Sequence, residues 1–387
     1  MSWDAIVGVV AFAIWAYLLV GRGGFWLARE RDDRDNIPAP TRWPSVTVVV
    51  PARNEADVIG QSIGSLLAQD YPGPFRVVLV DDDSDDGTAT AARQAAETLG
   101  QGPRLEVLTG AKLPPGWTGK LWALQQGVQH ATAQPEAPDY LLLTDADIGH
   151  SPDNLRNLVA RAEHEGRTLV SLMAELSCAN RAEAFLIPAF VFFFQMLYPF
   201  AWVAQRKRKL AAGAGGCMLM RRDALERAGG IAAVRSEIID DCALARRLKQ
   251  QGPIWLGLTR RARSLRPYGS FRQIGRMISR SAYAQLGYSP LLLAGTVAGM
   301  MLTYFAPPLL AILGEGLARW AGLGAWLLMA VSFQPMLRFY RLSPLWGFAL
   351  PAIAAAYTAF TVDSAVAVWR GRGGMWKGRA QAITGGP

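Results

Sequence analysis

Two short acidic segments hold carboxylates at spacings that could bind a ligand or a metal ion. In LVDDDSDDGT, residues 79–88, five aspartates fall within six positions directly after an apolar run. A structural turn needs only one or two of them, as a helix cap or beside the first-turn dipole. In TDAD, residues 144–147, Asp145 and Asp147 point the same way along an extended chain. That pair could address one hard cation, Mg²⁺ or Mn²⁺, with water and phosphate oxygens completing the shell.

A third acidic pair, Asp240 and Asp241, precedes an amphipathic helical pattern with Leu244 and Leu248 on its apolar face. Paired carboxylates at a helix start often act only as caps. A fixed carboxylate is also what a general base needs to accept a hydroxyl proton. The spacing alone leaves both interpretations open.

The elements around the acidic segments alternate between strand and helix patterns. Strands are expected at Val46–Val50, Phe75–Val80, Leu105–Leu108 and Tyr140–Leu143, with helical patterns within Arg53–Gln69 and Thr88–Leu99. This order predicts an α/β fold with a parallel sheet and right-handed crossovers. Open sheets of this kind bind ligands at the carboxyl ends of their strands. Both acidic segments are therefore expected at that edge, which favours a ligand site over a plain turn.

Several functional classes lack their usual sequence signals. The G-x-G-x-x-G turn of nicotinamide dehydrogenases is missing after both opening strands, and the chain has no Walker P-loop. A receiver domain places its aspartate pair after the first strand, whereas here the pair follows the second. The three cysteines are odd in number and show no C-x-x-C spacing, so a disulfide framework or a thiolate metal site is not expected.

The composition indicates a membrane protein. Hydrophobic residues make up 51% of the 387 positions, and the net charge is +9. The basic residues crowd beside apolar runs, which fits an anionic membrane surface better than nucleic acid. Residues 1–27 read as a retained N-terminal anchor, because an uncharged run from Ala5 to Val20 precedes Arg22 and further arginines. Basic flanks mark the cytoplasmic side, so the chain after the anchor is expected in the cytoplasm.

A second membrane region is expected at residues 290–370. Leu291–Leu313 and Leu345–Trp369 are long enough to span, while Leu323–Leu337 is shorter and could span or re-enter. Three crossings would place the basic tail, residues 371–387, outside. The positive-inside tendency favours the cytoplasm, which is the side we expect.

Two further segments suggest contact with the membrane surface. Residues 268–288 predict an amphipathic interfacial helix, in which Arg272, Arg276 and Arg280 share one face toward headgroups or a diphosphate, or form a solvated basic face. Residues 185–203 are aromatic and uncharged. They are expected to lie in the interface or against the C-terminal helices, as part of a lipid acceptor groove.

The order of the motifs resembles a known family. PARNE (51–55), VDDDSDDGT (80–88), GK followed by AL (119–124), TDAD (144–147), GAGGCMLMRRDAL (213–225) and IDDCAL (239–244) follow the order typical of family 2 glycosyltransferases with the GT-A fold. The match covers residues 44–265. With membrane segments on both sides, the chain looks most like the hopanoid-associated glycosyltransferases of bacteria, which are related to the ceramide glucosyltransferases.

The resemblance implies a Rossmann-like GT-A sheet, mostly parallel with helices on both faces, and a role for each motif. A uridine pocket would be lined by Pro51, Ala52, Arg53 and Glu55, with Asp82 binding the uracil ring and Lys120 meeting the diphosphate. Asp145 would face the ribose and the metal, Asp147 would bind the metal, and Asp241, beside Asp240, would be the catalytic base. The acceptor and phosphate side would contain Gly215, Gly216, Arg276 and Arg280. The family pattern has Gly where this chain has Asp83, so which aspartate of 81–83 contacts the base stays open.

The resemblance also implies an activity. The expected enzyme is an inverting, Mg²⁺- or Mn²⁺-dependent transferase that moves one sugar from a nucleotide sugar, a UDP-sugar, to a membrane lipid hydroxyl in hopanoid biosynthesis. The Q-x-x-R-W motif of processive members is reduced to Arg280 within residues 277–281, which favours single transfer. The expected location is the bacterial inner membrane, as a multi-pass protein with a cytoplasmic catalytic domain. Transfer to polyprenyl phosphate and a non-catalytic lipid-binding scaffold remain alternatives.

Overall fold

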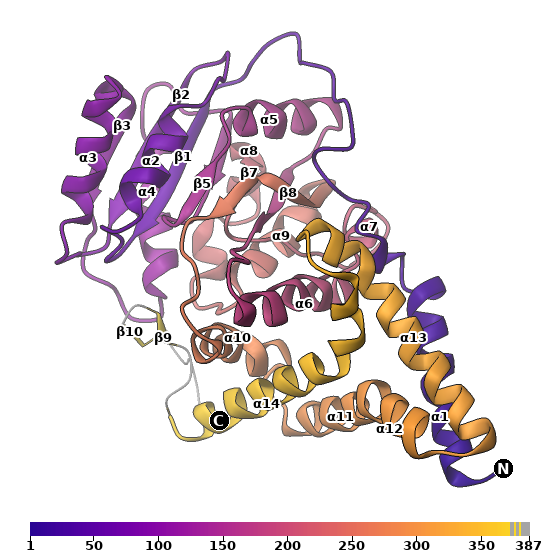
Figure 1. Ribbon diagram of the computed structural model, residues 1–387. Coiled ribbons are helices and arrows are strands. Elements are labelled where there is room, and N and C mark those ends of the chain that lie inside the picture. Colours follow the sequence, from indigo (N-terminus) through magenta and orange to yellow (C-terminus); the bar gives the residue numbers. More distant parts are fainter. Residues whose placement is uncertain (372–374, 377–378, 381–387) are drawn as a thin grey trace. The chain divides into compact units, whose positions relative to one another are not determined.

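The fold consists of two units that share the chain between them. The computed structural model describes residues 1–371, 375–376 and 379–380 (Figure 1). A helical unit contains residues 1–29, 178–201 and 268–373, and a sheet unit contains residues 30–177, 202–267 and the positions from 374 onward. The basic tail predicted for 371–387 lies almost entirely outside the described residues.

The sheet unit contains one eight-stranded sheet. Its strands are β1 (Val46–Ala52), β2 (Phe75–Asp81), β3 (Leu105–Thr109), β4 (Tyr140–Leu143), β5 (Ile148–His150), β6 (Leu169–Glu175), β7 (Met218–Arg221) and β8 (Ile254–Ser264). They lie in the order β3-β2-β1-β4-β7-β6-β8-β5. The pairs β1–β2, β2–β3, β1–β4 and β6–β8 are parallel, which confirms the predicted mostly parallel sheet. β7 and β5 run antiparallel to their neighbours, which the sequence patterns did not indicate.

Helices cover both faces of this sheet, as predicted. They are α2 (Ile59–Leu67), α3 (Thr88–Thr98), α4 (Gly119–Thr132), α5 (Asn154–His164), α8 (Arg222–Arg227) and α9 (Asp240–Gln251), with 3₁₀ turns η2 (Gly102–Arg104) and η3 (Ile231–Val234). Val48 and Val50 pack in one cluster with α2, α3 and α5. On the other face α4 approaches closely, because Gly127 has no side chain: a Cβ there would lie 2.4 Å from Val49 Cγ1.

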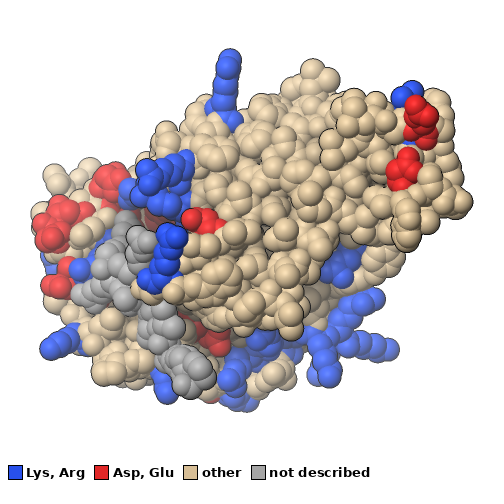
Figure 2. All heavy atoms as spheres, turned by 90° about the horizontal axis from the view of Figure 1, so that it is seen from below, with Lys and Arg blue, Asp and Glu red and all other residues tan. Residues whose placement is uncertain are grey.

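The helical unit contains the apolar N-terminal and C-terminal segments of the chain. It contains α1 (Trp3–Gly21), η1 (Phe25–Leu27), α6 (Arg181–Leu197), α10 (Phe271–Gln285), α11 (Pro290–Met300), the π-helical turn η4 (Met301–Phe305), α12 (Ala306–Leu313), α13 (Gly316–Phe339), η5 (Pro344–Ala349) and α14 (Leu350–Trp369). α7 (Phe200–Val203) lies at a boundary between the units, and β9 (Met375–Trp376) pairs with β10 (Arg379–Ala380). From below, a broad area of uncharged residues is visible (Figure 2).

Five stretches of the described residues are long and apolar enough to cross a membrane. They are Trp3–Gly21, Arg181–Val203, Pro290–Leu313, Gly316–Phe339 and Pro344–Trp369. The middle C-terminal helix is longer than the predicted 323–337, because it includes the charged Arg319. The Arg319 side chain donates to the Gly314 carbonyl at the preceding helix end (2.8 Å), so its charge does not end the helix. All three C-terminal stretches are therefore long enough to span.

A proline fixes the N-terminal helix in its place. Pro307 has no N–H and leaves the Thr303 carbonyl, four residues earlier, without its usual helical donor. The fully buried Trp15 of α1 fills that role, with its indole N–H donating to Thr303 O at 2.8 Å. Trp15 also packs edge-on against Tyr304. The π-helical turn just before the proline is thus the docking point of α1.

Candidate active site

The predicted site residues gather where the strand order of the sheet reverses. The chain runs outward from β1 to β3 and then returns to β4 on the other side of β1. Open α/β sheets bind ligands outside the carboxyl ends of the strands at such a point. Residues 51–55 leave β1 there, and residues 144–147 leave β4. The switch point therefore accounts for the meeting of motifs that lie about ninety residues apart in the sequence.

In the aspartate-rich turn after β2, some aspartates hold the turn and another is buried. Asp81 Oδ1 accepts from Ser84 N, and Asp86 accepts from Ala56 N and Thr88 N at 2.9 and 3.0 Å. These two aspartates hold the turn. Asp82 is 1% exposed and is the buried member of the 81–83 run. The turn contacts and the position predicted for the ligand contact thus fall to different residues of one segment.

Asp83 explains the departure from the family pattern. Its φ of 58° is left-handed, a conformation that favours glycine and that Asp tolerates better than most residues. Its side chain is 82% exposed. The residue that replaces the usual glycine therefore keeps the backbone path and points its carboxylate to solvent.

The loop after β1 is joined to this turn by several hydrogen bonds. Pro51 and Ala52 end the buried strand, and Arg53 donates to the Asp82 and Asp83 carbonyls. The Glu55 backbone N–H donates to Thr88 Oγ1 at 2.9 Å. These bonds hold the residues predicted for the nucleotide pocket, Arg53, Glu55 and Asp82, in one wall.

Arg266, at the end of β8, belongs to the site although no sequence motif indicated it. Its guanidinium forms ion pairs with Glu55 (2.5 Å) and with Asp57 (2.8 Å). The pKa of Asp147 is raised to about 6 by burial first, then by Asp145 and Glu55, while Arg266 acts in the opposite direction. The positive charge of Arg266 thus partly offsets the negative charge of the carboxylates around Asp147.

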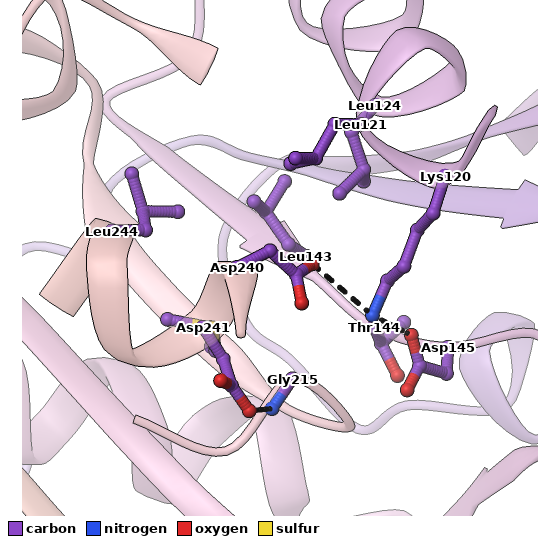
Figure 3. Close-up of a pocket in the computed structure, with 11 residues that line it drawn as sticks. Lys120, Leu121, Leu124, Leu143, Thr144, Asp145, Gly215, Asp240, Asp241 and Leu244 are labelled. Atoms are coloured by element: carbon purple, nitrogen blue, oxygen red, sulfur yellow. Dashed lines mark hydrogen bonds and ion pairs between the residues drawn. The ribbon is translucent and has the colours of Figure 1, made fainter. Parts of the chain in front are cut away.

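Lys120 connects the strand-end carboxylates to the third acidic pair. It lies in the first turn of α4, after the N-cap Thr118, and its Nζ is 2.7 Å from Asp145 Oδ1 and 3.5 Å from Asp240 Oδ2 (Figure 3). Burial opposes the charge on Lys120, but Asp145 and Asp240 outweigh it and raise the pKa of the lysine. Lys120 therefore stays protonated between the two halves of the site.

Asp240 and Asp241 open α9, and Asp241 is held by two backbone donors. Gly215 N–H donates to Asp241 Oδ2 at 3.0 Å, and Cys242 N–H donates to Oδ1 at 2.7 Å. The N-cap is Ile239, so neither aspartate is the capping residue. Burial and the neighbouring Asp240 raise the pKa of Asp241 to about 6, against the effect of Lys120. A half-buried carboxylate whose pKa is raised toward neutrality suits a general base.

The glycines of the 213–217 loop have separate tasks. A Cβ at Gly215 would lie 3.1 Å from Lys120 Nζ and 3.7 Å from Asp241 Oδ2, so a side chain there would enter the site. The Gly216 carbonyl accepts from Thr144 Oγ1. A pocket in the sheet unit is lined on its apolar side by Leu121, Leu124, Leu143, Met218 and Leu244 (Figure 3). Its other lining residues are Lys120, Thr144, Asp145, Gly215, Asp240 and Asp241.

The two predicted arginines of the acceptor side are not among these lining residues. Arg276 and Arg280 lie on α10 in the helical unit, where both are exposed. Their spacing on one helical face is as predicted, and their role stays a prediction.

The donor set at Asp145 and Asp147 fits a hard divalent cation. Within the described residues, no group of three His, Cys, Asp or Glu side chains could hold a metal ion unaided. Mg²⁺ commonly uses one or two carboxylates and completes its shell with water and substrate phosphates. A cation beside the half-buried Asp147 would also relieve its repulsion with Asp145 and Glu55. The residues present therefore match the predicted Mg²⁺ or Mn²⁺.

Comparisons with known proteins find a family match over part of the chain. Residues 47–229 match the family described as Glycosyl transferase family 2. An N-acetylglucosaminyltransferase of Mesorhizobium japonicum is 29% identical over 194 residues, which are 49% of this chain and 42% of that protein. A 4,4'-diaponeurosporenoate glycosyltransferase of Staphylococcus aureus is 34% identical over 104 residues, 27% of this chain and 24% of that protein. The matches thus cover less than half the length of either relative.

A solved structure supports the fold over nearly the whole chain. A mannosyltransferase from Pyrobaculum calidifontis, in complex with GDP-Man and Mn²⁺, superposes with a TM-score of 0.57 over 95% of this chain and 99% of its own. Its sequence identity of 22% makes this a likeness of fold. The predicted GT-A architecture is thereby confirmed.

Proposed function

Because residues 47–229 match the family described as Glycosyl transferase family 2, we propose that this protein transfers one sugar from a nucleotide sugar to a hydroxyl group of a membrane lipid. The observation that carries the proposal is the convergence of Lys120, Asp145 and Asp241 on one pocket. A cation for a diphosphate, a carboxylate for a metal and a carboxylate base are the three groups that such a transfer needs.

On the donor side, the wall formed by the 51–55 loop and the 81–88 turn would hold the nucleotide. The buried Asp82 is the proposed partner of a uracil ring, which makes a UDP-sugar the proposed donor. Asp145 and Asp147 would hold Mg²⁺ or Mn²⁺, which when bound neutralises charge on the diphosphate leaving group. Lys120 would add a fixed positive charge at the same group and would release Asp240 or Asp145 as it does so.

On the acceptor side, Asp241 would take the hydroxyl proton. The hydroxyl oxygen then attacks the anomeric carbon while the bond from that carbon to the diphosphate oxygen breaks, and the nucleoside diphosphate leaves with the bonding electron pair. One displacement inverts the anomeric centre and needs no covalent sugar intermediate. The hydrogen bonds from Gly215 and Cys242 fix both carboxylate oxygens, which keeps the base aimed without a further charge.

The proposed acceptor is a lipid, and the helical unit supports this choice. Its α6 carries Phe185, Phe192, Phe193 and Phe194, which pack against aromatic residues of its neighbours. One matching relative is named for transfer to 4,4'-diaponeurosporenoate. Within the lipids we propose a hopanoid, on the order of the motifs and the flanking membrane segments. The missing Q-x-x-R-W motif favours one sugar per acceptor.

We propose that the sheet unit lies in the cytoplasm of a bacterial cell, at the inner membrane, and that α6 does not cross. β7 pairs with β4 and β6, so residues 202–267 complete the sheet begun by residues 30–177. A single crossing by Arg181–Val203 would place these parts on opposite sides of a membrane. The basic residues after α1 favour the cytoplasmic side.

Removal of a metal ligand should abolish cation binding at the donor site. We expect Asp147→Asn to weaken Mn²⁺ binding in the presence of UDP by at least about tenfold, measured by electron paramagnetic resonance. Protons compete for Asp147, so wild-type affinity should fall as the pH drops below its pKa of about 6. Asp70→Asn, which removes a surface carboxylate paired with Arg156, is the charge-matched control. Wild-type Mn²⁺ affinity in Asp147→Asn would rule out this metal site.

Loss of the base should stop transfer but not donor binding. Asp241→Asn keeps one acceptor for the two backbone donors but cannot take a proton at neutral pH. We expect turnover to fall by at least about 10²-fold with nucleotide affinity unchanged, measured by product formation and by calorimetry. Asp240→Asn is the matched neighbour variant.

Three outcomes would contradict this account. Near-normal transfer by Asp241→Asn together with a large loss in Asp240→Asn would move the base to Asp240. Near-normal transfer by both variants would favour an acceptor that is already ionised, such as polyprenyl phosphate. Nucleotide binding by the wild type without turnover on a broad lipid panel would favour the scaffold.

Cysteine labelling tests the proposed orientation. Thr98→Cys and Glu136→Cys, both at exposed positions of the sheet unit, should resist a membrane-impermeant thiol reagent in intact cells of a Cys178→Ser background. Glu315→Cys is the accessible control, because α13 begins beside the N-terminal half of α1, where Gly8 meets Ala318. Efficient labelling at 98 and 136 before the cells are permeabilised would overturn the orientation.

A further inference from the structure

A buried row of polar side chains lies behind the carboxylates of the pocket. Thr144, His150 and Asn154 are 1%, 6% and 0% exposed, and they belong to the end of β4, to β5 and to the start of α5. Buried polar groups cost free energy unless they are hydrogen-bonded, so such a row persists only when its members satisfy one another. Neither the motifs nor the proposed chemistry uses His150 or Asn154.

The direction of each hydrogen bond in this row follows from one short contact. Thr144 Oγ1 lies 2.7 Å from the Gly216 carbonyl oxygen. A carbonyl only accepts, so the single hydroxyl hydrogen of Thr144 is donated to Gly216. His150 Nε2 lies 3.0 Å from the same Oγ1 and must therefore be the donor to it.

This assignment also fixes the tautomer of the imidazole. A neutral imidazole carries one N–H, so Nδ1 of His150 is bare and accepts from Asn154 Nδ2 at 2.8 Å. Burial lowers the pKa of His150 to about 4, so the ring is neutral at physiological pH. Each residue of the row therefore donates to the next: Asn154 to His150, His150 to Thr144, and Thr144 to the Gly216 carbonyl.

The end of the chain is the loop that holds the proposed base. Gly215, next to Gly216, donates its N–H to Asp241 Oδ2 at 3.0 Å. Two adjacent glycines have more backbone freedom than any other pair of residues, so this N–H needs external fixing to stay in place. Ser171 fixes the other side of the loop through Ala214 N at 2.9 Å. Thr144 fixes the Gly216 side and is itself the neighbour of Asp145.

We propose that Thr144 and His150 are positioning residues that hold the 213–217 loop so that Gly215 fixes the Asp241 carboxylate beside Lys120 and Asp145. The pair touches no reacting atom. It sets the geometry between the strand end that carries Asp145 and the loop that aims the base. The catalytic consequence rests on the proposed function, whereas the ordering of the loop does not.

The decisive variants change one hydroxyl. Thr144→Val keeps nearly the same shape but leaves the Gly216 carbonyl and the His150 N–H without partners, while Thr144→Ser keeps the hydroxyl. Thr47→Val is the matched control, a buried threonine at the amino end of β1 that accepts from Arg76. His150→Gln keeps an N–H donor near the position of Nε2, and His150→Phe removes it.

Hydrogen exchange tests the loop without any need for activity. In a peptide covering residues 211–218, Thr144→Val should exchange the loop amides at least about tenfold faster than wild type, with Thr144→Ser and Thr47→Val unchanged. His150→Phe should behave like Thr144→Val, and His150→Gln like wild type. If Thr144→Val does not fold, the comparison of His150→Phe with His150→Gln tests the same point. Equal exchange in all folded variants would overturn the proposal.

Kinetics then test the effect on the base. We expect kcat to fall about 10- to 100-fold in Thr144→Val, with the donor Kd unchanged and with recovery in Thr144→Ser. Faster loop exchange with an unchanged kcat would refute the positioning of Asp241. A wild type that transfers no sugar would defeat the proposed function, and the exchange result would still decide whether Thr144 and His150 order the loop.

Discussion

Repulsion among carboxylates is the constraint around which the sheet unit is arranged. Six of them meet at the carboxyl edge of the sheet: Glu55, Asp57, Asp145, Asp147, Asp240 and Asp241. Two basic side chains, Lys120 and Arg266, form ion pairs within this group. Part of the negative charge remains: burial raises the pKa values of Asp147 and Asp241 first, and neighbouring carboxylates raise them further. A divalent cation is the natural complement of such a site, and a diphosphate can enter it only together with positive charge.

The fold holds these like charges together with rigid elements rather than with more countercharge. β1 and β4 are buried parallel strands whose ends cannot separate without breaking the sheet. α4 is drawn close by Gly127, which brings Lys120 to the edge. The 213–217 loop is fixed by Ser171 and Thr144 from the strands beneath it. Gly127 and Ser171 lie outside the acidic motifs and Thr144 directly precedes Asp145, yet each contact sets where a carboxylate can be.

The local patterns of the sequence were sufficient for β1 to β4 and for the edge at which the acidic segments meet, whereas β5, β6 and β8 were not predicted. The continuous valine run predicted β1. The i, i+2 argument for Asp145 and Asp147 assumed an extended chain, whereas residues 146–147 form a turn, so their common direction stays a prediction. The approach of Asp240 to Lys120 could not be read from spacing, because four strands (β4 to β7) and four helices (α5 to α8) intervene, and it came from the resemblance alone. Arg266 and the Thr144–His150 pair were missed for a related reason: single polar residues that act through tertiary contacts leave no periodic signal. The antiparallel β7 was missed because a four-residue apolar run carries no direction.

The stereochemistry of the product tests the account most directly. The protein, reconstituted with membrane lipids, would be supplied with ¹³C-labelled UDP-glucose and other α-linked nucleotide sugars, and the anomeric configuration of the new lipid glycoside would be measured by nuclear magnetic resonance. A single displacement assisted by Asp241 predicts a β-linked product carrying one sugar. An α-linked product would require a second displacement or a different mechanism, and would contradict the role given to this cluster of carboxylates.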